Sequence, residues 1–453
     1  MSHYRINRRR FLQASAAALP ALIAACGGAG TSTPTAPQAK PAITPTAAPH
    51  VSGPSGASVT LTVLTHWGDQ SLLKALTPWF EECARKVNVR IVHQTVAFDQ
   101  LLTKIMTGRL GGQSVDIYHF YNLWLPDFVG SDLLAPPPVD VVDDIKSSYG
   151  QGSVEGVTYN GQVWGYPTEV DSYQLIYNKR IFDEAGVDEV PKTWDDVRAA
   201  AKRCTKKDSN GKISQAGFML IKGWDSGVVH PWLSLLWSNG GEFVSKDYSR
   251  ALFNQQPGVQ TLGFEMDLIN DGSVNLGFGL EDFVSGKVAM TIMANWWGAS
   301  LRASSLGIKS FGSAPIPYND GHESVALQYN WLWGVDKNSP HADMAWKFIE
   351  CLNSPRKDKA SPMGEYLTTG LNALPSRLSD QKALANRIND PFIKPFVDAL
   401  RNARTEPIIP GAQEIKTSLQ KQIEAAWYKQ KSPKEALDTA AQEADRILQE
   451  KRQ

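Results

Sequence analysis

The segment from residue 165 to 197 constrains the fold more than any other part of the chain. Its sequence is GYPTEVDSYQLIYNKRIFDEAGVDEVPKTWDDV. A strand-like run follows Pro167, the pattern changes from strand to helix at Asn178, and Thr193 begins a further helix. Because the apolar periodicity changes from two to 3.6 at a defined point, the segment predicts an α/β unit.

The region before this segment alternates strand and helix patterns. In chain order they are Val59–Thr65 (strand), Leu72–Cys83 (helix), Val89–Val96 (strand), Leu101–Leu110 (helix) and Val115–Tyr118 (strand). This order predicts a mostly parallel sheet with helices on both faces. Ligands bind beyond the carboxyl ends of the strands in such sheets, which selects the loops at 67–69 and 120–124.

Two shorter patterns predict local structure nearer the carboxyl end. Asn210-Gly211 is typical of a turn between short strands. A final helix is predicted to begin at Ser432, because Pro433 and Glu435 complete a capping box there.

The first 25 residues have the pattern of an export signal. They contain four arginines and no acidic residue, and the apolar run at 11–25 is too short for a bilayer core of roughly 30 Å. Arg8 and Arg9, within NRRRFLQ, resemble the twin-arginine motif, which implies export through the Tat route after folding. Cys26, within IAAC, resembles the lipobox cysteine of bacterial lipoproteins, which implies that it carries a lipid anchor.

The segment that follows the signal has almost no large apolar residue. Thr, Pro, Ala and Gly dominate residues 26–57, so the segment predicts a disordered, lipidated linker. About 395 residues remain, which is more than one hydrophobic core normally holds. The sequence therefore predicts at least two lobes.

The net charge limits which partners the protein can bind, and the cysteine content limits which disulfides it can form. Without the signal, the balance of basic and acidic residues moves from 46 against 46 to 42 against 46, a net charge of −4. This charge, without a basic block, argues against a nucleic-acid partner. Cys83, Cys204 and Cys351 are separate and odd in number, so no disulfide framework is predicted and each is expected to be a small buried residue.

The 165–197 segment also resembles the first inter-lobe hinge of the family 1 extracytoplasmic solute-binding proteins of ABC importers, which include maltose-binding proteins. Other landmarks follow in the family's order: Phe283–Met290 leading into Asn295–Trp297, a second crossing at Phe311–Pro317, a returning strand at Val325–Val335 and a helix at Ala342–Leu352. The resemblance covers about residues 59–448. It implies a two-lobed α/β, periplasmic-binding-protein-like (type II) fold that closes on a ligand.

The resemblance also implies the domain organisation and the partners. The predicted parts are a signal at 1–25, the linker at 26–57, an N-terminal lobe at 58–168 and 318–350, and a C-terminal lobe at 169–317 and 351–453. The expected protein is a monomer, anchored by lipid on the outer face of the bacterial cytoplasmic membrane. It would capture a carbohydrate and deliver it to ABC permease subunits, without a cofactor or metal.

Enzyme motifs are absent from the sequence. There is no Gly-x-Ser-x-Gly, phosphate-binding loop, Cys-x-x-Cys or His-Glu-x-x-His, and no two histidines have metal-ligand spacing. An exported carbohydrate-active enzyme remains an alternative, because its carboxylates could come from distant loops. Another alternative is a receptor of the same fold for a non-sugar ligand, such as a glycerol phosphodiester, a polyamine or a peptide. Of these, a phosphate ligand would be expected only in a basic cleft.

The sequence feature that indicates a function is the placement of its aromatic residues. Many of the 14 tryptophans fall in loops or at element ends, beside carboxylates and amides. A sugar needs flat aromatic surface for its C–H face and fixed hydrogen-bonding groups for its hydroxyls. The resemblance adds a stacking role for Trp296 and a ligand-binding role for Asp171. The predicted ligand-binding residues are Trp67, Asp69, Phe120, Asn122, Asp171, Trp224, His230, Trp296, Trp297, Tyr329, Trp331 and Glu414.

Overall fold

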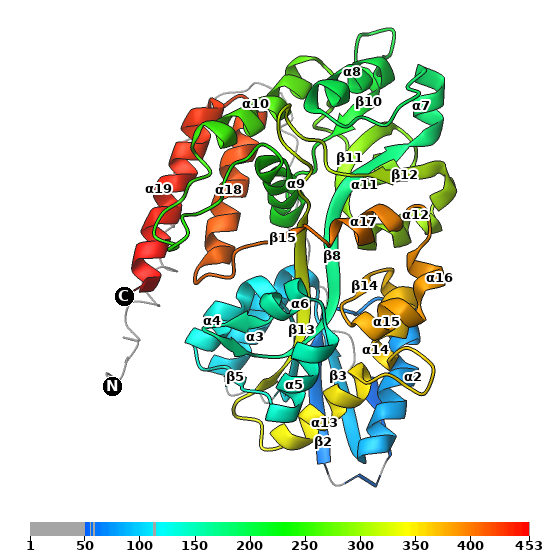
Figure 1. Cartoon of the computed structure of the whole chain (residues 1–453), viewed down its shortest axis with the longest axis vertical. Coiled ribbons are helices and arrows are strands. Elements are labelled where there is room, and N and C mark those ends of the chain that lie inside the picture. Colours follow the sequence, from blue (N-terminus) through cyan, green and yellow to red (C-terminus); the bar gives the residue numbers. More distant parts are fainter. Residues whose placement is uncertain (1–49, 55, 58, 112–114, 453) are drawn as a thin grey trace, which may run out of the picture. The chain divides into compact units, whose positions relative to one another are not determined.

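The computed structural model describes residues 50–54, 56–57, 59–111 and 115–452 (Figure 1). The predicted export signal with Arg8 and Arg9, the predicted lipidation site Cys26 and most of the predicted linker lie outside the described residues. The described end of the linker is not disordered as predicted, because His50–Ser52 forms a strand that pairs with residues 91–93. Residues 46–453 form one compact unit. Among the described residues, no helix combines the length and apolar character that a transmembrane span requires.

The strands belong to one large sheet and one small hairpin. Their bounds are β1 His50–Ser52, β2 Val59–Thr65, β3 Val89–Thr95, β4 Ile117–Tyr121, β5 Leu134–Ala135, β6 Thr158–Tyr159, β7 Gln162–Val163, β8 Tyr166–Asn178, β9 Lys206–Lys207, β10 Ile213–Met219, β11 Val288–Ala294, β12 Phe311–Ala314, β13 Leu327–Asp336, β14 Leu374–Pro375 and β15 Arg404–Thr405.

Helices flank the large sheet. The longer ones are α2 Gln70–Val87, α3 Phe98–Leu110, α5 Val139–Ser148, α8 Trp194–Cys204, α9 Asp225–Trp237, α10 Gln256–Asn270, α13 Ala342–Asn353, α18 Ala412–Trp427 and α19 Pro433–Arg452. The shorter ones are η1 Asn122–Trp124, α4 Leu125–Gly130, α6 Gln151–Gly156, α7 Lys179–Ala185, α11 Leu280–Val284, η2 Asn295–Trp297, α12 Gly298–Ala303, η3 Ile308–Ser310, α14 Pro362–Tyr366, η4 Leu367–Leu371, α15 Leu378–Ala383, α16 Ala385–Ile388 and α17 Lys394–Ala399.

The strands join in the order β1-β3-β2-β4-β13-β8-β11-β10-β9. The pairs β2/β3, β2/β4 and β10/β11 are parallel, as the alternating pattern predicts. The pairs β4/β13, β13/β8 and β8/β11 are antiparallel, so the sheet is more mixed than predicted. The difference arises because the two long strands β8 and β13 run against their neighbours.

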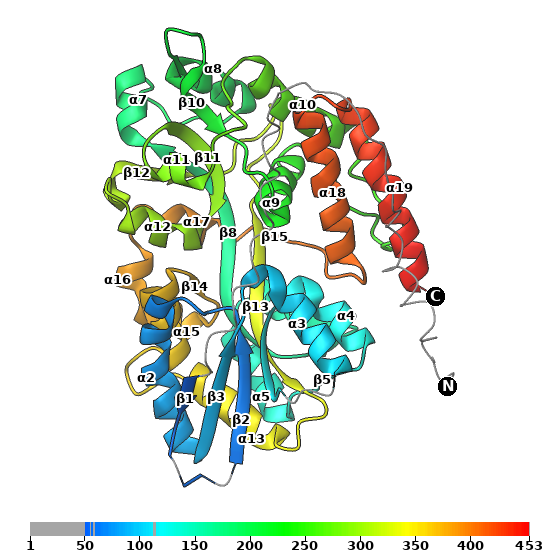
Figure 2. The same ribbon diagram turned by 180° about the vertical axis from the view of Figure 1, so that it is seen from behind.

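Strand β8 joins the two halves of the sheet (Figures 1 and 2). Its first part pairs with β13 up to Ser172, and its second part pairs with β11 and β12 from Tyr173 onward. Gly165 precedes it, and a Cβ there would lie 2.1 Å from the carbonyl oxygen of Trp333. The partner of β8 therefore changes a few residues after the boundary predicted at 168/169, which stays a prediction.

Most predicted elements form where the sequence places them. Strand β2 has the predicted bounds, and β3 ends one residue before its predicted end. Thr193 caps α8 in a capping box with Asp196. Ser432 and Glu435 exchange backbone-to-side-chain hydrogen bonds at the start of α19, which confirms the other predicted box.

The expectation for the cysteines is wrong in one respect. Cys83 and Cys351 form a disulfide, with their Cα atoms 5.7 Å apart, whereas Cys204 is free and buried as predicted. The bond joins α2 to α13, and α14 also contacts α2. The chain just beyond residue 351, predicted to belong to the C-terminal lobe, thus packs against a helix of the first half of the sheet.

Candidate ligand-binding site

A cavity of about 480 Å³ lies where the two halves of the sheet meet. Its lining comes from strands β4, β8 and β13, from helices α2, α3 and η4, and from segments that follow β2, β10 and β11. The lining residues are His66, Leu72, Phe98, Tyr121, Glu169, Asp171, Trp224, Ser226, Leu280, Trp296, Tyr329, Trp331 and Leu371.

Aromatic rings form much of the cavity wall. Trp296 donates a hydrogen bond from Nε1 to the Tyr329 hydroxyl at 2.9 Å, which fixes the orientation of its indole. Trp224 packs against it edge to face, with ring centroids 6.0 Å apart. Trp331 packs against His66, with ring centroids 4.3 Å apart. The cavity therefore offers flat, fixed aromatic surface, which suits the C–H face of a sugar ring.

Two buried carboxyl groups from one strand line the same cavity. Glu169 and Asp171 are separated by two positions on β8, so they share a face. Burial raises the pKa of Glu169 to about 7. Burial, and then the charge of Glu169, raises the pKa of Asp171 well above its usual range.

Asn295, in η2 just before α12, holds the side chain of Asp171 in place by a hydrogen bond. The Asn295 side-chain amide donates to Asp171 Oδ1 at 2.7 Å, and its carbonyl oxygen accepts from the backbone N–H of Ser172 at 2.8 Å. Asn295 thereby ties η2 to β8 at the position where β8 changes partner. Asp171 thus both lines the cavity and forms a hydrogen bond across the junction between β8 and η2.

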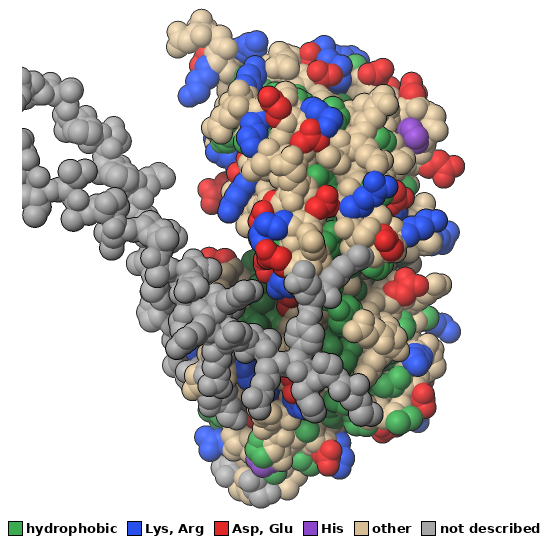
Figure 3. Space-filling view, turned by 90° about the vertical axis from the view of Figure 1, so that its left-hand side faces the viewer, with side chains coloured by type: hydrophobic (Ala, Val, Ile, Leu, Met, Phe, Trp, Pro, Cys, Tyr) green, Lys and Arg blue, Asp and Glu red, His purple; other side chains and the backbone are tan. Residues whose placement is uncertain are grey.

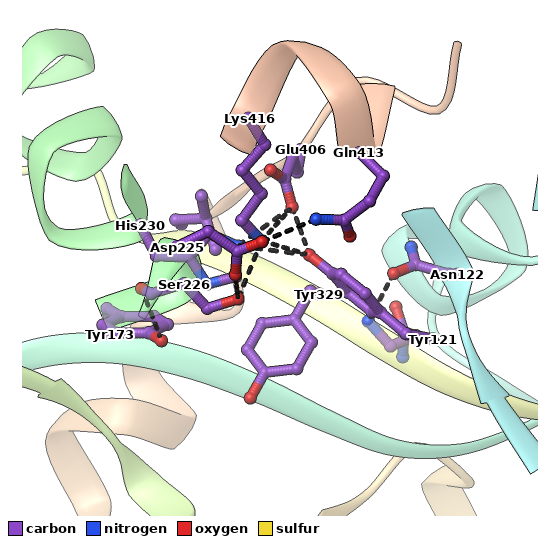
Figure 4. A network of polar contacts seen from close by, with 12 residues as sticks. Tyr121, Asn122, Tyr173, Asp225, Ser226, His230, Tyr329, Glu406, Gln413 and Lys416 are labelled. Atoms are coloured by element: carbon purple, nitrogen blue, oxygen red, sulfur yellow. Dashed lines mark hydrogen bonds and ion pairs between the residues drawn. The ribbon is translucent and has the colours of Figure 1, made fainter. Parts of the chain in front are cut away.

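A buried polar network lies behind Tyr121 and Ser226 (Figure 4). Lys416 of α18 donates to Ser226 Oγ at 2.8 Å and to the Tyr121 hydroxyl at 3.2 Å, and its Nζ lies 3.6 Å from the Glu406 carboxylate. His230 Nε2 lies 2.6 Å from Lys416 Nζ and 3.0 Å from Glu406. Tyr121 also donates to Glu406. The network thus joins β4, α9 and α18 beside the cavity.

Charges within the network set its protonation. Burial alone would raise the pKa of Glu406, but Lys416, His230 and the Tyr121 hydroxyl lower it to about 2. Burial and the charge of Lys416 lower the pKa of His230. Glu406 is therefore an anion matched by Lys416, and His230 is neutral near pH 7.

The structure brings together some of the residues predicted from sequence. Asp171, Trp224, Trp296, Tyr329 and Trp331 all line the cavity. His230 lies directly behind it, buried in the network with Lys416.

Other predicted residues lie in the core rather than at the cavity. Trp67 is fully buried against His119, Trp333 and Tyr366. Phe120 packs on Phe128, and Trp297 packs on Phe283. Asn122 is buried and accepts a bond from the backbone of Asn330. Their side chains are occupied by packing and do not line the cavity.

Two further predicted residues are exposed and serve helices. Asp69 caps α2 by accepting from Ser71, and Glu414 forms an ion pair of 3.2 Å with Lys451 of α19. Neither carboxylate lines the cavity.

Sequence reasoning missed His66, Tyr121 and Glu169. His66 and Tyr121 are direct neighbours in sequence of the predicted residues Trp67, Phe120 and Asn122. Successive side chains of an extended chain point to opposite faces, so an error of one position exchanges cavity and core. Glu169 could have been found as the residue two positions before Asp171.

Other hollows have a different chemical character. Three larger ones, of about 840, 770 and 750 Å³, have no Phe, Tyr or Trp in their lining. Among the residues that the structure describes, no group of three or more His, Cys, Asp and Glu side chains is placed to hold a metal. Acidic and basic side chains are interspersed on the uncovered part of the face in Figure 3.

Comparison with known proteins identifies the family. The family described as bacterial extracellular solute-binding protein matches residues 69–359. This chain is a bacterial extracellular solute-binding protein. Relatives of this solute-binding protein include the maltodextrin-binding protein MdxE of Bacillus subtilis (strain 168), which is 23% identical over 324 residues, 69% of this chain and 72% of that protein. The diacetylchitobiose binding protein DasA of Streptomyces coelicolor is 23% identical over 367 residues, 78% of this chain and 81% of that protein.

Solved structures show the same fold. The GacH receptor of Streptomyces glaucescens, solved unliganded and with acarbose, superposes with a TM-score of 0.75 at 20% identity, covering 88% of this chain and 99% of that one. The cyclic alpha-maltosyl-1,6-maltose binding protein of Arthrobacter globiformis gives a TM-score of 0.71 at 23% identity, covering 86% and 99%. The predicted family and its two-lobed α/β architecture are thereby confirmed for this solute-binding protein.

Proposed function

We propose that this protein is the carbohydrate receptor of an ABC importer and that the cavity beneath Trp296 is its binding site. The observation that carries the proposal is the set of oriented aromatic rings beside two buried carboxyls. That composition matches a sugar, whose C–H faces stack on rings and whose hydroxyls bond to charged or polar groups. The sugar-binding relatives are consistent with this ligand class.

The transport step follows from the position of the cavity along β8. A ligand that contacts Trp331 and Tyr121 on one side and Trp296 and Trp224 on the other stabilises the closed arrangement of the lobes. Closure about β8 and β13 is a hinge transition, and the ligand shifts it only through contacts that favour the closed form. The closed, loaded receptor then delivers the sugar to the permease.

The export route and the anchor belong to the same proposal. Arg8 and Arg9 direct Tat export, and lipid on Cys26 holds the monomeric receptor at the outer face of the cytoplasmic membrane. Cys26→Ala is expected to release the protein from the membrane fraction of cells. Arg8→Lys together with Arg9→Lys is expected to leave it in the cytoplasm.

The binding experiment uses protein lacking residues 1–45, which keeps the compact unit and its strand β1. A panel of mono- and oligosaccharides is expected to contain a ligand that changes tryptophan emission and raises the melting temperature. No response to any sugar would contradict the carbohydrate proposal. Prolonged incubation gives the second readout, because a receptor returns its sugar unchanged whereas an enzyme would alter it.

A further inference from the structure

We propose that the physiological ligand carries a positive charge and is an amino sugar, whose protonated amine lies between the Glu169 and Asp171 carboxyls. The inference rests on the proposed function and specifies its ligand class. It follows from an excess of acidic over basic groups in the cavity lining. Glu169 and Asp171 line the cavity, and no lysine or arginine is among the described residues that line it with them.

The nearest buried lysine does not correct the imbalance. Lys416 lies behind the cavity wall, where it is matched by Glu406 and held by Ser226 and Tyr121. Asp225, the residue before Ser226, adds a further carboxylate on that side and accepts a bond from Gln413. The surroundings of the cavity are therefore acidic in sum.

The histidines near the two carboxyls are neutral. His119 Nε2 lies 3.6 Å from Glu169 and 2.9 Å from the Thr168 hydroxyl, and burial lowers the pKa of His119 well below its usual range. Burial, and then the charge of His119, does the same to the pKa of His66. Neither ring supplies a positive charge near pH 7.

Two polar atoms of the cavity wall are buried and have no hydrogen-bond partner among the residues that the structure describes. They are His66 Nδ1 and Trp224 Nε1, and both residues line the cavity. Buried polar groups are normally hydrogen-bonded, and an unpaired one costs free energy. A ligand hydroxyl that reaches either atom would supply the missing partner, and an amino sugar has such hydroxyls whereas a simple cation lacks them.

An ammonium group suits the rest of the lining as well. Trp224, Trp296 and Trp331 offer aromatic faces, which attract cations through the ring quadrupole. Burial raises the pKa of both carboxyls, so they favour the neutral form in an empty cavity. An ammonium between them allows them to ionise as paired charges, which a neutral sugar cannot do.

The first test compares ligands that differ only in the amine. Protein lacking residues 1–45, which keeps the compact unit whole, is titrated calorimetrically with glucosamine, galactosamine and the glucosamine dimer, and with glucose, galactose and cellobiose as their neutral partners. Spermidine serves as a cation without a sugar ring. The amine member of the binding pair is expected to bind at least tenfold more tightly than its neutral partner.

Each outcome separates the inference from the proposed function. If only neutral sugars bind, the charge inference fails and the sugar receptor stands. If spermidine binds and no sugar does, the cavity is a cation site and the sugar proposal fails, together with the amino-sugar identity. If no compound binds, both are contradicted.

The second test removes each charge without changing shape. Glu169→Gln and Asp171→Asn are each expected to weaken binding of the amino sugar by about 10- to 100-fold, the range for a hydrogen bond to a charged group. Glu265→Gln is the matched control, since Glu265 is an equally buried carboxyl that accepts from Trp427 at 2.9 Å outside this cavity. Equal losses in control and test variants would overturn the inference.

The third test is the pH profile of affinity. The titratable groups facing the two carboxyls are the carboxyls themselves, His66, His119, Tyr173, Tyr329 and Tyr366. Because the pKa of Glu169 is about 7, an ammonium ligand gains its ionised partner as the pH rises. Affinity for the amino sugar is expected to rise on the order of tenfold from pH 5.5 to 7. A flat profile in wild type, or the same rise in Glu169→Gln, would overturn the assignment.

Discussion

Replacing Lys416 with methionine should strongly destabilise the protein, because it leaves the Glu406 carboxylate buried without its cation. Lys416 and Glu406 are 1% and 3% exposed, so water cannot compensate for the loss. Removing one partner of a buried ion pair costs about 3–5 kcal/mol. For about 400 residues the unfolding entropy is about 0.8 kcal/mol per degree, so the melting temperature should fall by about 4–6 °C.

The pH dependence gives this prediction its sharpest form. The pKa of Glu406 is depressed to about 2, so its stabilising charge is present above pH 4.5 and is lost as the pH falls towards 2. In Lys416→Met the carboxyl loses its main cation and protonates more readily. The deficit in unfolding free energy relative to wild type should therefore shrink between pH 7 and pH 4.

Urea unfolding at several pH values, followed by circular dichroism, measures this deficit. Lys421→Met, on the exposed side of the same helix, is the control for helix propensity and should change stability by less than about 0.5 kcal/mol. Lys416→Met combined with Glu406→Gln should recover part of the loss, since the unpaired charge is gone. A deficit for Lys416→Met no larger than that of the control would refute the ion-pair reasoning.

Three further predictions concern the tryptophans Trp296 and Trp297, the disulfide between Cys83 and Cys351, and the buried carboxyl of Glu169. Trp296→Ala should weaken binding of the sugar ligand at least tenfold, about 1.4 kcal/mol by calorimetry, whereas Trp297→Ala should lower the melting temperature because that ring is core; the reverse pattern would contradict the assignment. Replacing both Cys83 and Cys351 with serine should cost about 2–5 kcal/mol in urea unfolding, because the bond closes a loop of 268 residues; unchanged stability under non-reducing conditions would contradict a formed bond. Since the pKa of Glu169 is raised to about 7, the ligand-free protein should lose stability as the pH rises from 4.5 through 7, and Glu169→Gln should lose less, by thermal melts; parallel pH curves would contradict this.

Much of the fold could be predicted from the sequence because the residue patterns that determine its strands and helices are local. The alternation in Val59–Thr65 and the change of period at Asn178 depend on neighbouring residues only, and both appear in the structure as β2 and the β8–α7 junction. The disulfide was not readable, because Cys83 and Cys351 are 268 residues apart and meet only when α2 packs on α13.

The cavity-lining residues could be predicted better within the long strands β8 and β13 than at the ends of the other strands. Tyr329 and Trp331 line the cavity, as the strand period of two predicts, and Asp171, which was predicted from the family resemblance, lines it as well. Trp67 and Phe120 lie in the core because the phase of the alternation is set by packing beyond the local sequence.

The buried ion pair was also invisible to sequence reasoning. Lys416 lies on α18 and Glu406 in the preceding segment, and His230 comes from α9, far earlier in the chain. A lysine in a helical pattern predicts an exposed face, and only the tertiary fold buries it against Tyr121. Such a network can be identified only in the folded structure, because its residues are far apart in the sequence.

A crystal structure of the protein with the sugar that stabilises it most tests the central claim most directly. The account predicts a sugar ring against the Trp296 indole in the 480 Å³ cavity, with polar groups bonded to Glu169 and Asp171. Ligand density elsewhere, for example in the 840 Å³ hollow beside Arg302 and Asn372, with the aromatic cavity empty, would contradict it.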